Sequence, residues 1–332
     1  MSTIYDVAKL AGVSPATVSR VFNGAAVSAE RAHAVREAAK QLKFTPNRTA
    51  RTLRRQASEL IALIIPDIEN PYFTELARGV EDVASSAGFS VVLCNTDSEL
   101  DKESAYLQIA ISEHMAGVIL AAASYDSKLD DILAAGRPVV AVDRTTRDDV
   151  DAVIMANRLA GEAATENLIN AGFRRIACIT GPERVETARE RVLGWRTAVA
   201  RHLPGTDPDE LLRYSTFRVP GGREVMEDLL SLPEPADAVV AGNNLLGVGA
   251  IQVLNEHGLT PPGFGVAVIG SLPFTTLSPS AVTVVRLPAR HMGVTAAKML
   301  LERIAGDDQP ARTVILRNVL EPARIPMADP PH

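Results

Sequence analysis

The sequence predicts an α/β protein that carries a small all-α head at its N-terminus. Residues 1–46 repeat apolar side chains at helical spacing, whereas from Leu60 onward short apolar runs alternate with amphipathic stretches. That alternation is typical of parallel βαβ units. A chain of 332 residues is also too long for one ordinary domain, so two or three domains are expected.

The first expected helix begins near the N-terminus. Ile4, Val7, Ala8 and Ala11 fall on one helical face, and Gly12 is suited to ending the helix after them. A short first helix that ends at a glycine leaves the chain free to turn at once into a second helix.

The second expected helix runs from Pro15 to about Asn23. Ser14 suits its N-cap and Pro15 its first position, because the N-terminal turn needs a side-chain acceptor and can do without one backbone N–H. Its buried side would carry Val18, and a third helix begins after Ser28. Two short helices joined by a glycine-containing turn form the helix-turn-helix pattern.

The charge of the chain is divided unevenly. Residues 1–56 hold ten Lys and Arg against three Asp and Glu, a net charge of +7. Since the whole chain carries −6, the remainder carries −13. A basic head on an acidic body favours nucleic-acid binding by the head, although a solvated basic face would give the same count.

A short basic segment follows the head. Pro46 stops the third helix, and Asn47 can cap a segment from Arg48 to Arg55 whose one large apolar residue is Leu53. Isolated helices shorter than about 12 residues are marginal in water. The segment is therefore either a linker or a helix that orders only against a partner.

The body contains repeated strand-like runs. They are Ile61–Ile65, Ser90–Cys94, Gly117–Leu120, Val139–Val142, Ile176–Ile179, Ala238–Val240 and Val266–Ile269. Helical patterns separate these runs, so parallel sheets are expected, with ligand sites at the carboxyl ends of the strands.

Several function classes find no support in the sequence. There is no phosphate-binding loop, no nucleophile elbow and no His/Cys cluster at metal spacing, so no catalytic residue, metal or cofactor is expected. The longest apolar run, Met115–Ala123, is too short for a membrane span. No signal peptide is evident, and Cys94 and Cys178 suit buried free thiols in a reducing cytosol. A cytoplasmic, non-enzymatic protein is expected.

The run from Thr3 to Gly24, which reads TIYDVAKLAGVSPATVSRVFNG, resembles the head of the lactose/galactose repressor family. The resemblance implies that the second helix enters the major groove of DNA. It implies base reading by Pro15, Ala16 and Arg20, and backbone contacts by Tyr5, Ser14, Thr17, Ser19 and Asn23. The chemistry agrees, because Arg20 can grip guanine bidentately while Ala16 and Pro15 suit a thymine methyl.

The pattern Ala50-Arg51-Thr52-Leu53 resembles the family's hinge helix. That likeness implies that the segment enters the minor groove and that Leu53 wedges a base step, with Ala50 and Arg51 beside it. Paired hinge helices require a homodimer on a near-palindromic operator, and a tetramer stays open.

For the body, the resemblance implies a core of two lobes of the periplasmic-binding-protein type, each with a doubly wound parallel sheet. The expected divisions are a head at 1–46, a hinge at 47–59 and a core at 60–332, with lobe 1 at about 60–157 and 288–318 and lobe 2 at about 158–287 and 319–328.

The family's effector cleft lies between the lobes, and matching positions imply a ligand site here. These positions are Asn70, Tyr72, Phe73, Asp143, Arg144, Arg191, Trp195, Asn243 and Ser271. Among these residues, Arg191 is the one most strongly expected to contact the effector, because the planar fork of its guanidinium group suits hydroxyls or carboxylates. Tyr72 could stack on a ring. For Phe73, stacking and simple packing are equally open.

One stretch departs from the family. An aspartate usually follows the strand that ends here at Ile269, but this chain reads Gly270-Ser271-Leu272-Pro273, and the usual Asn-Asp is Asn243-Asn244. With both acids lost and Arg144, Arg189 and Arg191 expected nearby, the effector could be a sugar acid or a phosphorylated sugar rather than a neutral sugar. The same departure leaves open a regulator that has lost its effector.

The sequence thus predicts a cytoplasmic, nucleoid-associated regulator of transcription, a repressor rather than an activator. Double-stranded operator DNA, a sugar-like effector and a second copy of the chain would be its partners. A periplasmic solute-binding protein would share the body, but it would need a signal peptide and lack the basic head.

Overall fold

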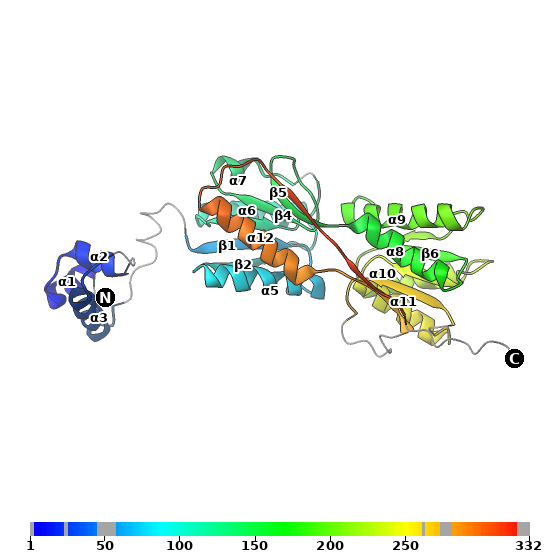
Figure 1. Cartoon of the computed structure of the whole chain (residues 1–332), viewed down its shortest axis with the longest axis horizontal. Coiled ribbons are helices and arrows are strands. Elements are labelled where there is room, and N and C mark those ends of the chain that lie inside the picture. The colour runs from blue at the N-terminus through cyan, green and yellow to red at the C-terminus, as the bar shows by residue number, and fades with distance from the viewer. Residues whose placement is uncertain are drawn as a thin grey trace. The chain divides into compact units, whose positions relative to one another are not determined.

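The chain folds into two compact units, residues Met1–Ser58 and Glu59–His332, in a computed structural model (Figure 1). The structure describes residues 3–22, 26–44, 58–125, 127–260, 263–272 and 281–323. Two sets of sequence-based interpretations lie outside these residues. They are the backbone contact assigned to Asn23 and the hinge assignments of Ala50, Arg51 and Leu53, which stay predictions.

The first unit contains α1 (Ile4–Ala11), α2 (Pro15–Phe22) and α3 (Ala29–Gln41). A capping box starts α1: the Thr3 backbone N–H donates to Asp6 at 2.7 Å, and the Asp6 N–H donates to the Thr3 hydroxyl at 3.3 Å. Gly12 ends α1 in the left-handed region, at φ 65°, where a residue without Cβ is unstrained.

Ser14 caps α2 as the sequence predicts, because its hydroxyl accepts from the Thr17 N–H at 3.1 Å. The three helices enclose a small core in which Val7, Val18 and Val35 are fully buried. Phe22 and Phe44 close it with ring centroids 5.9 Å apart. The head thus has a fixed core despite its size.

Lobe 1 of the second unit is a six-stranded sheet with the order β11-β5-β4-β3-β1-β2. All its strand pairs are parallel. Its elements are β1 (Leu60–Ile65), α5 (Pro71–Ser86), β2 (Ser90–Asn95), α6 (Leu100–Ser112), β3 (Gly117–Leu120), α7 (Asp130–Ala134), β4 (Val139–Val142), β5 (Asp151–Met155), α12 (Ala289–Ile304) and β11 (Thr313–Leu316).

The central strand β1 shows why the lobe 1 sheet is covered on both faces. Ile61, Leu63 and Ile65 belong to one apolar cluster, with residues of α5 and α12, while Ala62 and Ile64 belong to a second cluster, with residues of α6 and α7. Successive side chains of a strand point to opposite faces. An unbroken apolar run is therefore what a doubly covered parallel strand requires.

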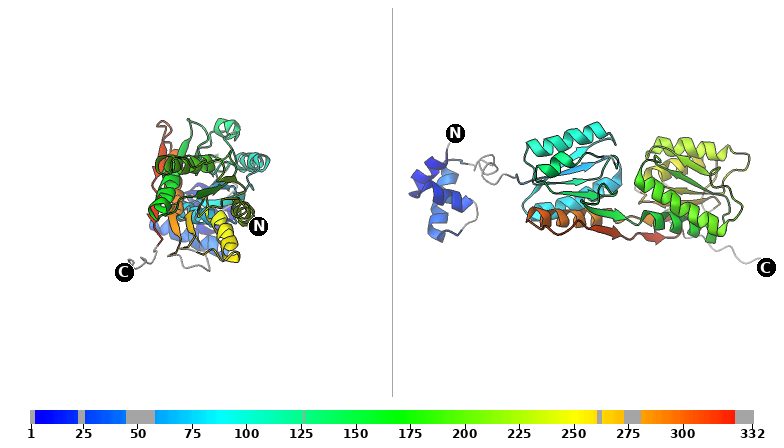
Figure 2. Two further views of the ribbon diagram at one scale, coloured as in Figure 1. Left: turned by 90° about the vertical axis from the view of Figure 1, so that its right-hand side faces the viewer. Right: turned by 90° about the horizontal axis from the view of Figure 1, so that it is seen from above.

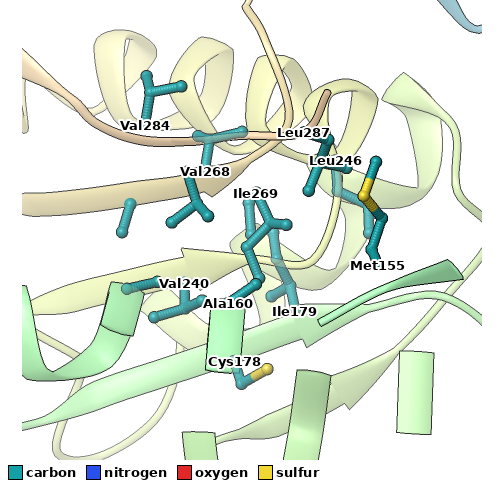
Figure 3. Close-up of a cluster of buried hydrophobic side chains, with 14 of the residues drawn as sticks. Met155, Ala160, Cys178, Ile179, Val240, Leu246, Val268, Ile269, Val284 and Leu287 are labelled. Carbon is teal, nitrogen blue, oxygen red and sulfur yellow. The ribbon is translucent and has the colours of Figure 1, made fainter. Parts of the chain in front are cut away.

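Lobe 2 repeats this design with the strand order β12-β10-β9-β8-β6-β7, and β12 alone pairs antiparallel to its neighbour. Its elements are α8 (Asn157–Asn170), β6 (Ile176–Thr180), α9 (Glu186–His202), β7 (Leu212–Tyr214), α10 (Val219–Leu230), β8 (Ala238–Ala241), α11 (Asn244–Glu256), β9 (Gly265–Ile269), β10 (Thr283–Arg286) and β12 (Val319–Glu321). Figure 3 shows part of its apolar core, where Ile179, Val240 and Val268 from three neighbouring strands lie together.

The chain passes between the lobes three times: from β5 to α8, from β10 to α12, and from β11 to β12. The orange and red segments of Figure 2 lie along the same side of both lobes. Neither lobe is a continuous stretch of sequence. The lobes are thus joined by three connections along one side (Figure 2).

Pairs of helices approach one another closely at glycines. A Cβ on Gly161 of α8 would lie 2.1 Å from the Arg191 carbonyl oxygen, and one on Gly194 of α9 would lie 2.0 Å from the Arg158 carbonyl oxygen. Gly79 and Gly293 bring α5 and α12 together in the same reciprocal way. These contacts set the distance between the helices that cover the sheets.

All the strands predicted from apolar runs are present, with bounds within one residue. The prediction did not name β5, β7, β10, β11 and β12. Two of them, β7 and β12, have three residues each, and two of the four residues of β11 are exposed. Cys94 and Cys178 are buried and free, as expected. Among the described residues, no helix is long and apolar enough to cross a membrane.

We expect Gly161→Ala to destabilise the core by about 1–3 kcal/mol, because the added methyl group meets the backbone of α9 and not a side chain that can move. Chemical denaturation followed by circular dichroism measures the change. Leu159→Ala, at an exposed position of the same helix, is the matched control and should have little effect. Equal stability of the two variants would contradict the close approach.

Candidate functional site

The head presents one exposed face on α2. Pro15, Ala16 and Arg20 are exposed, and Ala16 and Arg20 lie four residues apart, which places them on the same side of the helix. Arg20 forms no hydrogen bond or ion pair with any residue that the structure describes. Its guanidinium is free to contact something outside the chain.

The residues expected to contact a DNA backbone surround this face. Tyr5 on α1 is 70% exposed. Ser14 and Thr17 have hydroxyl oxygens 2.9 Å apart and take part in the cap of α2, so they are held at the start of that helix. Ser19 is half-buried. The described candidates thus lie on α1, on α2 and in the turn between them.

In the second unit, a cavity opens between the lobes at the carboxyl ends of β1, β4, β8 and β9. It encloses about 610 Å³ of space, part of it open to solvent. We call it the cleft cavity. It is lined by Asn70, Pro71, Tyr72, Phe73, Glu75, Asp143, Arg144, Thr187, Arg191, Phe217, Asn243, Asn244, Ile269, Gly270, Ser271 and Leu287.

The structure brings together every effector residue expected from the sequence except one. Asn70, Tyr72, Phe73, Asp143, Arg144, Arg191, Asn243 and Ser271 all line the cleft cavity. They come from both lobes and from segments far apart in the sequence. Their meeting at one cavity follows from the two parallel sheets, whose carboxyl ends face one another across the cleft.

Trp195 is the exception, and its assignment to the ligand site needs correction. The side chain is fully buried in lobe 2, and its indole N–H donates to the Ile176 carbonyl at 3.1 Å. Helix α9 runs from the cleft into the lobe, so Trp195 lies one turn beyond Arg191 and reaches the core instead of the cavity. Its one hydrogen-bond donor is already used.

Arg191 is held rigidly on α9. Its Nε donates to the Asn157 side-chain oxygen at 2.9 Å, and its Nη1 donates to the Gly242 carbonyl. Burial lowers the pKa of Arg191, but an arginine stays charged in proteins. Two of its donors are fixed to the protein, which leaves the rest of the planar fork for a ligand.

Asp143 and Arg144 face Arg191 from lobe 1. Asp143 directly follows β4 with φ 68°, a left-handed conformation that Asp tolerates better than most residues. Its carboxylate lies 3.3 Å from Arg144 Nε, and Arg144 Nη1 donates to the Ala122 carbonyl at 2.7 Å. The cavity therefore has a fixed acceptor and a fixed donor side by side.

Two asparagines line the cavity and also cap helices. Asn70 accepts from the Tyr72 N–H at 3.1 Å and starts α5. Asn243 accepts from the Leu246 N–H at 2.8 Å, and its amide donates to the Phe217 carbonyl at 3.2 Å. Their side chains are preorganised by these bonds, with part of their hydrogen-bonding capacity already used.

Tyr72 and Phe73 form an edge-to-face pair with ring centroids 5.0 Å apart. The Tyr72 hydroxyl donates to Met292 Sδ at 3.3 Å. Burial and the charge of Asp143 raise the pKa of Tyr72 well above its ordinary value, so the hydroxyl is neutral at physiological pH. Phe73 is buried in the core as well as lining the cavity.

Sequence reasoning missed several lining residues. Thr187 lies four residues before Arg191 on α9, so helical spacing could have identified it. Phe217 lies between the three-residue strand β7 and α10, where no sequence pattern marks it. Glu75 adds a second carboxylate to the lining. Two carboxylates thus balance two guanidinium groups in the cleft cavity.

Polar contacts also join the lobes directly. The backbone N–H and hydroxyl of Thr145 in lobe 1 donate to Glu186 of α9 at 2.8 and 2.9 Å. Arg218 in lobe 2 lies 3.0 Å from Glu69 and 3.4 Å from Asp67 in lobe 1. Exposed ion pairs contribute little stability, so the Arg218 pairs add little to the stability of this lobe arrangement.

The chemistry of the cleft cavity suits a hydroxyl-rich molecule. Fixed donors and a fixed acceptor can bind several hydroxyls in a set geometry, while Tyr72, Phe73 and Phe217 supply aromatic surface. Among the described residues, no group of three or more His, Cys, Asp and Glu side chains is placed to hold a metal ion.

Comparison with family models gives two matches along the chain. Residues 3–47 match a model described as bacterial regulatory proteins, lacI family. Residues 58–323 match a model described as periplasmic binding proteins and sugar binding domain of LacI family. Together these models span the head and nearly all of the two-lobed core.

Individual relatives match over almost their whole length. The ribose operon repressor of Halalkalibacterium halodurans is 35% identical, with 92% of this chain and 91% of that protein covered. The HTH-type transcriptional repressor PurR of Aliivibrio fischeri is 31% identical, with 94% of each covered. Among solved structures, a transcriptional regulator CelR–cellobiose complex is 30% identical, with a TM-score of 0.72 and with 97% of this chain and 98% of that chain covered.

We expect the fluorescence of Trp195, the one tryptophan of the chain, to be shielded from acrylamide in the folded protein, because the indole is fully buried. Trp195→Phe should lower the free energy of unfolding by about 1–3 kcal/mol, since the Ile176 carbonyl loses its partner. Quenching of the folded protein as strong as that of the unfolded chain would place the indole at the cavity after all.

Proposed function

The chain belongs to the LacI family of bacterial regulatory proteins, and we propose on that basis that it is a DNA-binding transcriptional repressor controlled by a small effector. One observation carries the proposal: the exposed face of Pro15, Ala16 and Arg20 stands on a folded helix-turn-helix of the same chain that forms the cleft cavity. A DNA reader and a ligand site in one molecule are the two parts that a ligand-controlled regulator needs.

In this proposal α2 lies in the major groove of the operator. Arg20 donates two hydrogen bonds to one guanine, and the apolar Ala16 and Pro15 contact a thymine methyl. Tyr5, Ser14, Thr17, Ser19 and Asn23 bind the phosphates and set the register of the helix. Phosphate contacts release counterions, so affinity should fall steeply with salt.

The proposal extends to the hinge and to the assembly. The segment with Ala50, Arg51 and Leu53 folds on the minor groove, where Leu53 opens a base step. Two copies of the chain bind a near-palindromic operator, one half-site each. The proposal also places the protein in the cytoplasm, at the nucleoid, without enzymatic activity.

We further propose that the effector of the cleft cavity is sugar-like. Arg191 and Asp143 can bind hydroxyls on opposite sides of a ring, and the relatives include a repressor named for a ribose operon and a regulator solved with cellobiose. The effector acts by preferring one angle between the lobes, which shifts the population of molecules whose head and hinge can bind DNA.

Two other functions fit the structure less well. The folded head with its exposed Arg20 argues against a periplasmic solute-binding protein, which needs only the two-lobed core. Arg191 argues against a regulator without an effector, because this arginine lines the cleft cavity and is held in place there by Asn157 and Gly242.

Selection of bound duplexes from a random pool tests the DNA-binding part. We expect the protein to enrich a near-palindromic sequence with a guanine in each half-site. Arg20→Ala should relax the preference at that guanine and cost about 1–3 kcal/mol. Arg36→Ala, an exposed position on α3 with the same loss of charge, should weaken binding alike for all sequences. Enrichment of no sequence by the unaltered protein would contradict the proposal.

The effector part is tested on the selected operator with a panel of sugars and sugar acids. Arg191→Lys keeps the charge but loses the fork, so the concentration of the active sugar needed for half-maximal response should rise about tenfold or more. Arg201→Lys changes an exposed arginine of the same helix and should leave the response unaltered. A response that is equal in both variants would exclude the cleft cavity as the effector site.

A further inference from the structure

A second cavity shares Arg144 with the cleft cavity. It encloses about 870 Å³ of space, part of it open to solvent, and we call it the arginine cavity. Its polar walls include Tyr125, Arg144 and Thr145 from lobe 1 and Arg184, Glu186 and Arg189 from lobe 2. The cavity therefore lies between the lobes and is built by both of them.

The two cavities differ in charge. Two carboxylates balance two guanidinium groups in the cleft cavity. In the arginine cavity, Glu186 is the one carboxylate that the described residues contribute, against Arg184, Arg189 and the shared Arg144, whose charge Asp143 offsets at 3.3 Å. The Glu186 carboxylate accepts both hydrogen bonds from Thr145, which hold it at the contact between the lobes. The arginine cavity is thus the electropositive one.

Two arginines of this cavity retain unused donors. Arg184 and Arg189 are exposed, and neither forms a hydrogen bond or ion pair with any residue that the structure describes. Arg144 is 7% exposed, and its buried Nε has no hydrogen-bond partner, although Asp143 lies at ion-pair distance. Exposed arginines alone are common on surfaces, but here they stand with a buried arginine on the wall of one cavity.

The position of α9 adds to the positive potential of the arginine cavity. The helix begins at Glu186 on the wall of the cavity and runs for 17 residues, so the positive end of its dipole lies at the cavity. Arg189 follows within the first turn. Because residues 189 and 191 lie about 200° apart around a helix, Arg189 lines this cavity while Arg191 lines the other.

We propose that the arginine cavity binds the phosphate group of a small metabolite. A phosphate monoester carries about two negative charges and three acceptor oxygens, so it can accept hydrogen bonds from Arg184 and Arg189 at the same time. A carboxylate has two oxygens, which a single guanidinium fork satisfies, so it would leave the second exposed arginine without a partner.

A bound phosphate would connect the lobes. Arg144 belongs to lobe 1 and Arg184 and Arg189 to lobe 2, so an anion between them stabilises the lobe arrangement in which Thr145 contacts Glu186. The consequence for DNA binding rests on the proposed function, through the same shift of lobe populations.

The phosphate can come from two sources. It can belong to a phosphorylated sugar that reaches from the cleft cavity past the shared Arg144, or to a separate small metabolite that occupies the arginine cavity alone. The chemistry at the arginines is the same in both cases, and the ligands used in the test distinguish them.

Calorimetry on the full chain in a phosphate-free buffer tests the proposal with inorganic phosphate, ribose and ribose 5-phosphate. The variant is R184S/R189S, which removes two exposed side chains and should fold normally. The control K128S/K298S removes the same charge from exposed lysines that line neither cavity.

We expect inorganic phosphate, ribose 5-phosphate or both to bind the unaltered protein and the control with equal affinity, and to bind R184S/R189S about tenfold or more weakly. A spanning effector requires ribose 5-phosphate to bind more tightly than ribose or phosphate, and a separate metabolite requires phosphate affinity to be independent of ribose. Equal affinity in R184S/R189S, or no binding of either phosphate compound, would overturn the proposal. The assay contains no DNA, so its outcome is separate from that of the operator selection.

Discussion

The close contact of α8 with α9 determines how the ligand site of this protein is built. Gly161 and Gly194 let the two backbones touch, so Arg191 Nε can donate at 2.9 Å to the side-chain oxygen of Asn157 on the neighbouring helix. A longer distance between the helices would leave a buried guanidinium without that partner, which is costly. The same contact fixes the direction of α9, and with it the positions of Thr187, Arg189 and Trp195.

Much of this fold could be predicted because its determining patterns are local. The apolar run of β1 satisfies both faces of a covered sheet, and the glycine and serine around α2 end one helix and cap the next. Strand β11 was not predicted because it is a four-residue edge strand with Thr313 and Ile315 exposed, so it lacks the continuous burial of the central strands. The pairing of β10 with β12 depends on segments far apart in the sequence, which no local pattern records.

The candidate site was predictable only where a residue's role follows from its place at a strand end. Asp143 directly follows β4 and lines the cavity for that reason. Trp195 was misplaced because the sequence shows helical spacing but not where along its axis the helix leaves the cavity. Thr187, Arg191 and Trp195 share one face of α9, yet only the first two lie at the cleft, and the third lies in the core.

The arginines show why residue type alone does not define a ligand. Their abundance near the missing acids suggested an anionic effector, on the assumption that Arg144, Arg189 and Arg191 face one space. The structure divides them, because Arg189 faces away from Arg191 and Asp143 offsets Arg144. A balanced cavity favours hydroxyls, and an unbalanced one favours an anion. The lobes therefore enclose two cavities with different binding chemistry. Arg144 lines both cavities, so a ligand bound in one of them can change the affinity of the other through this residue.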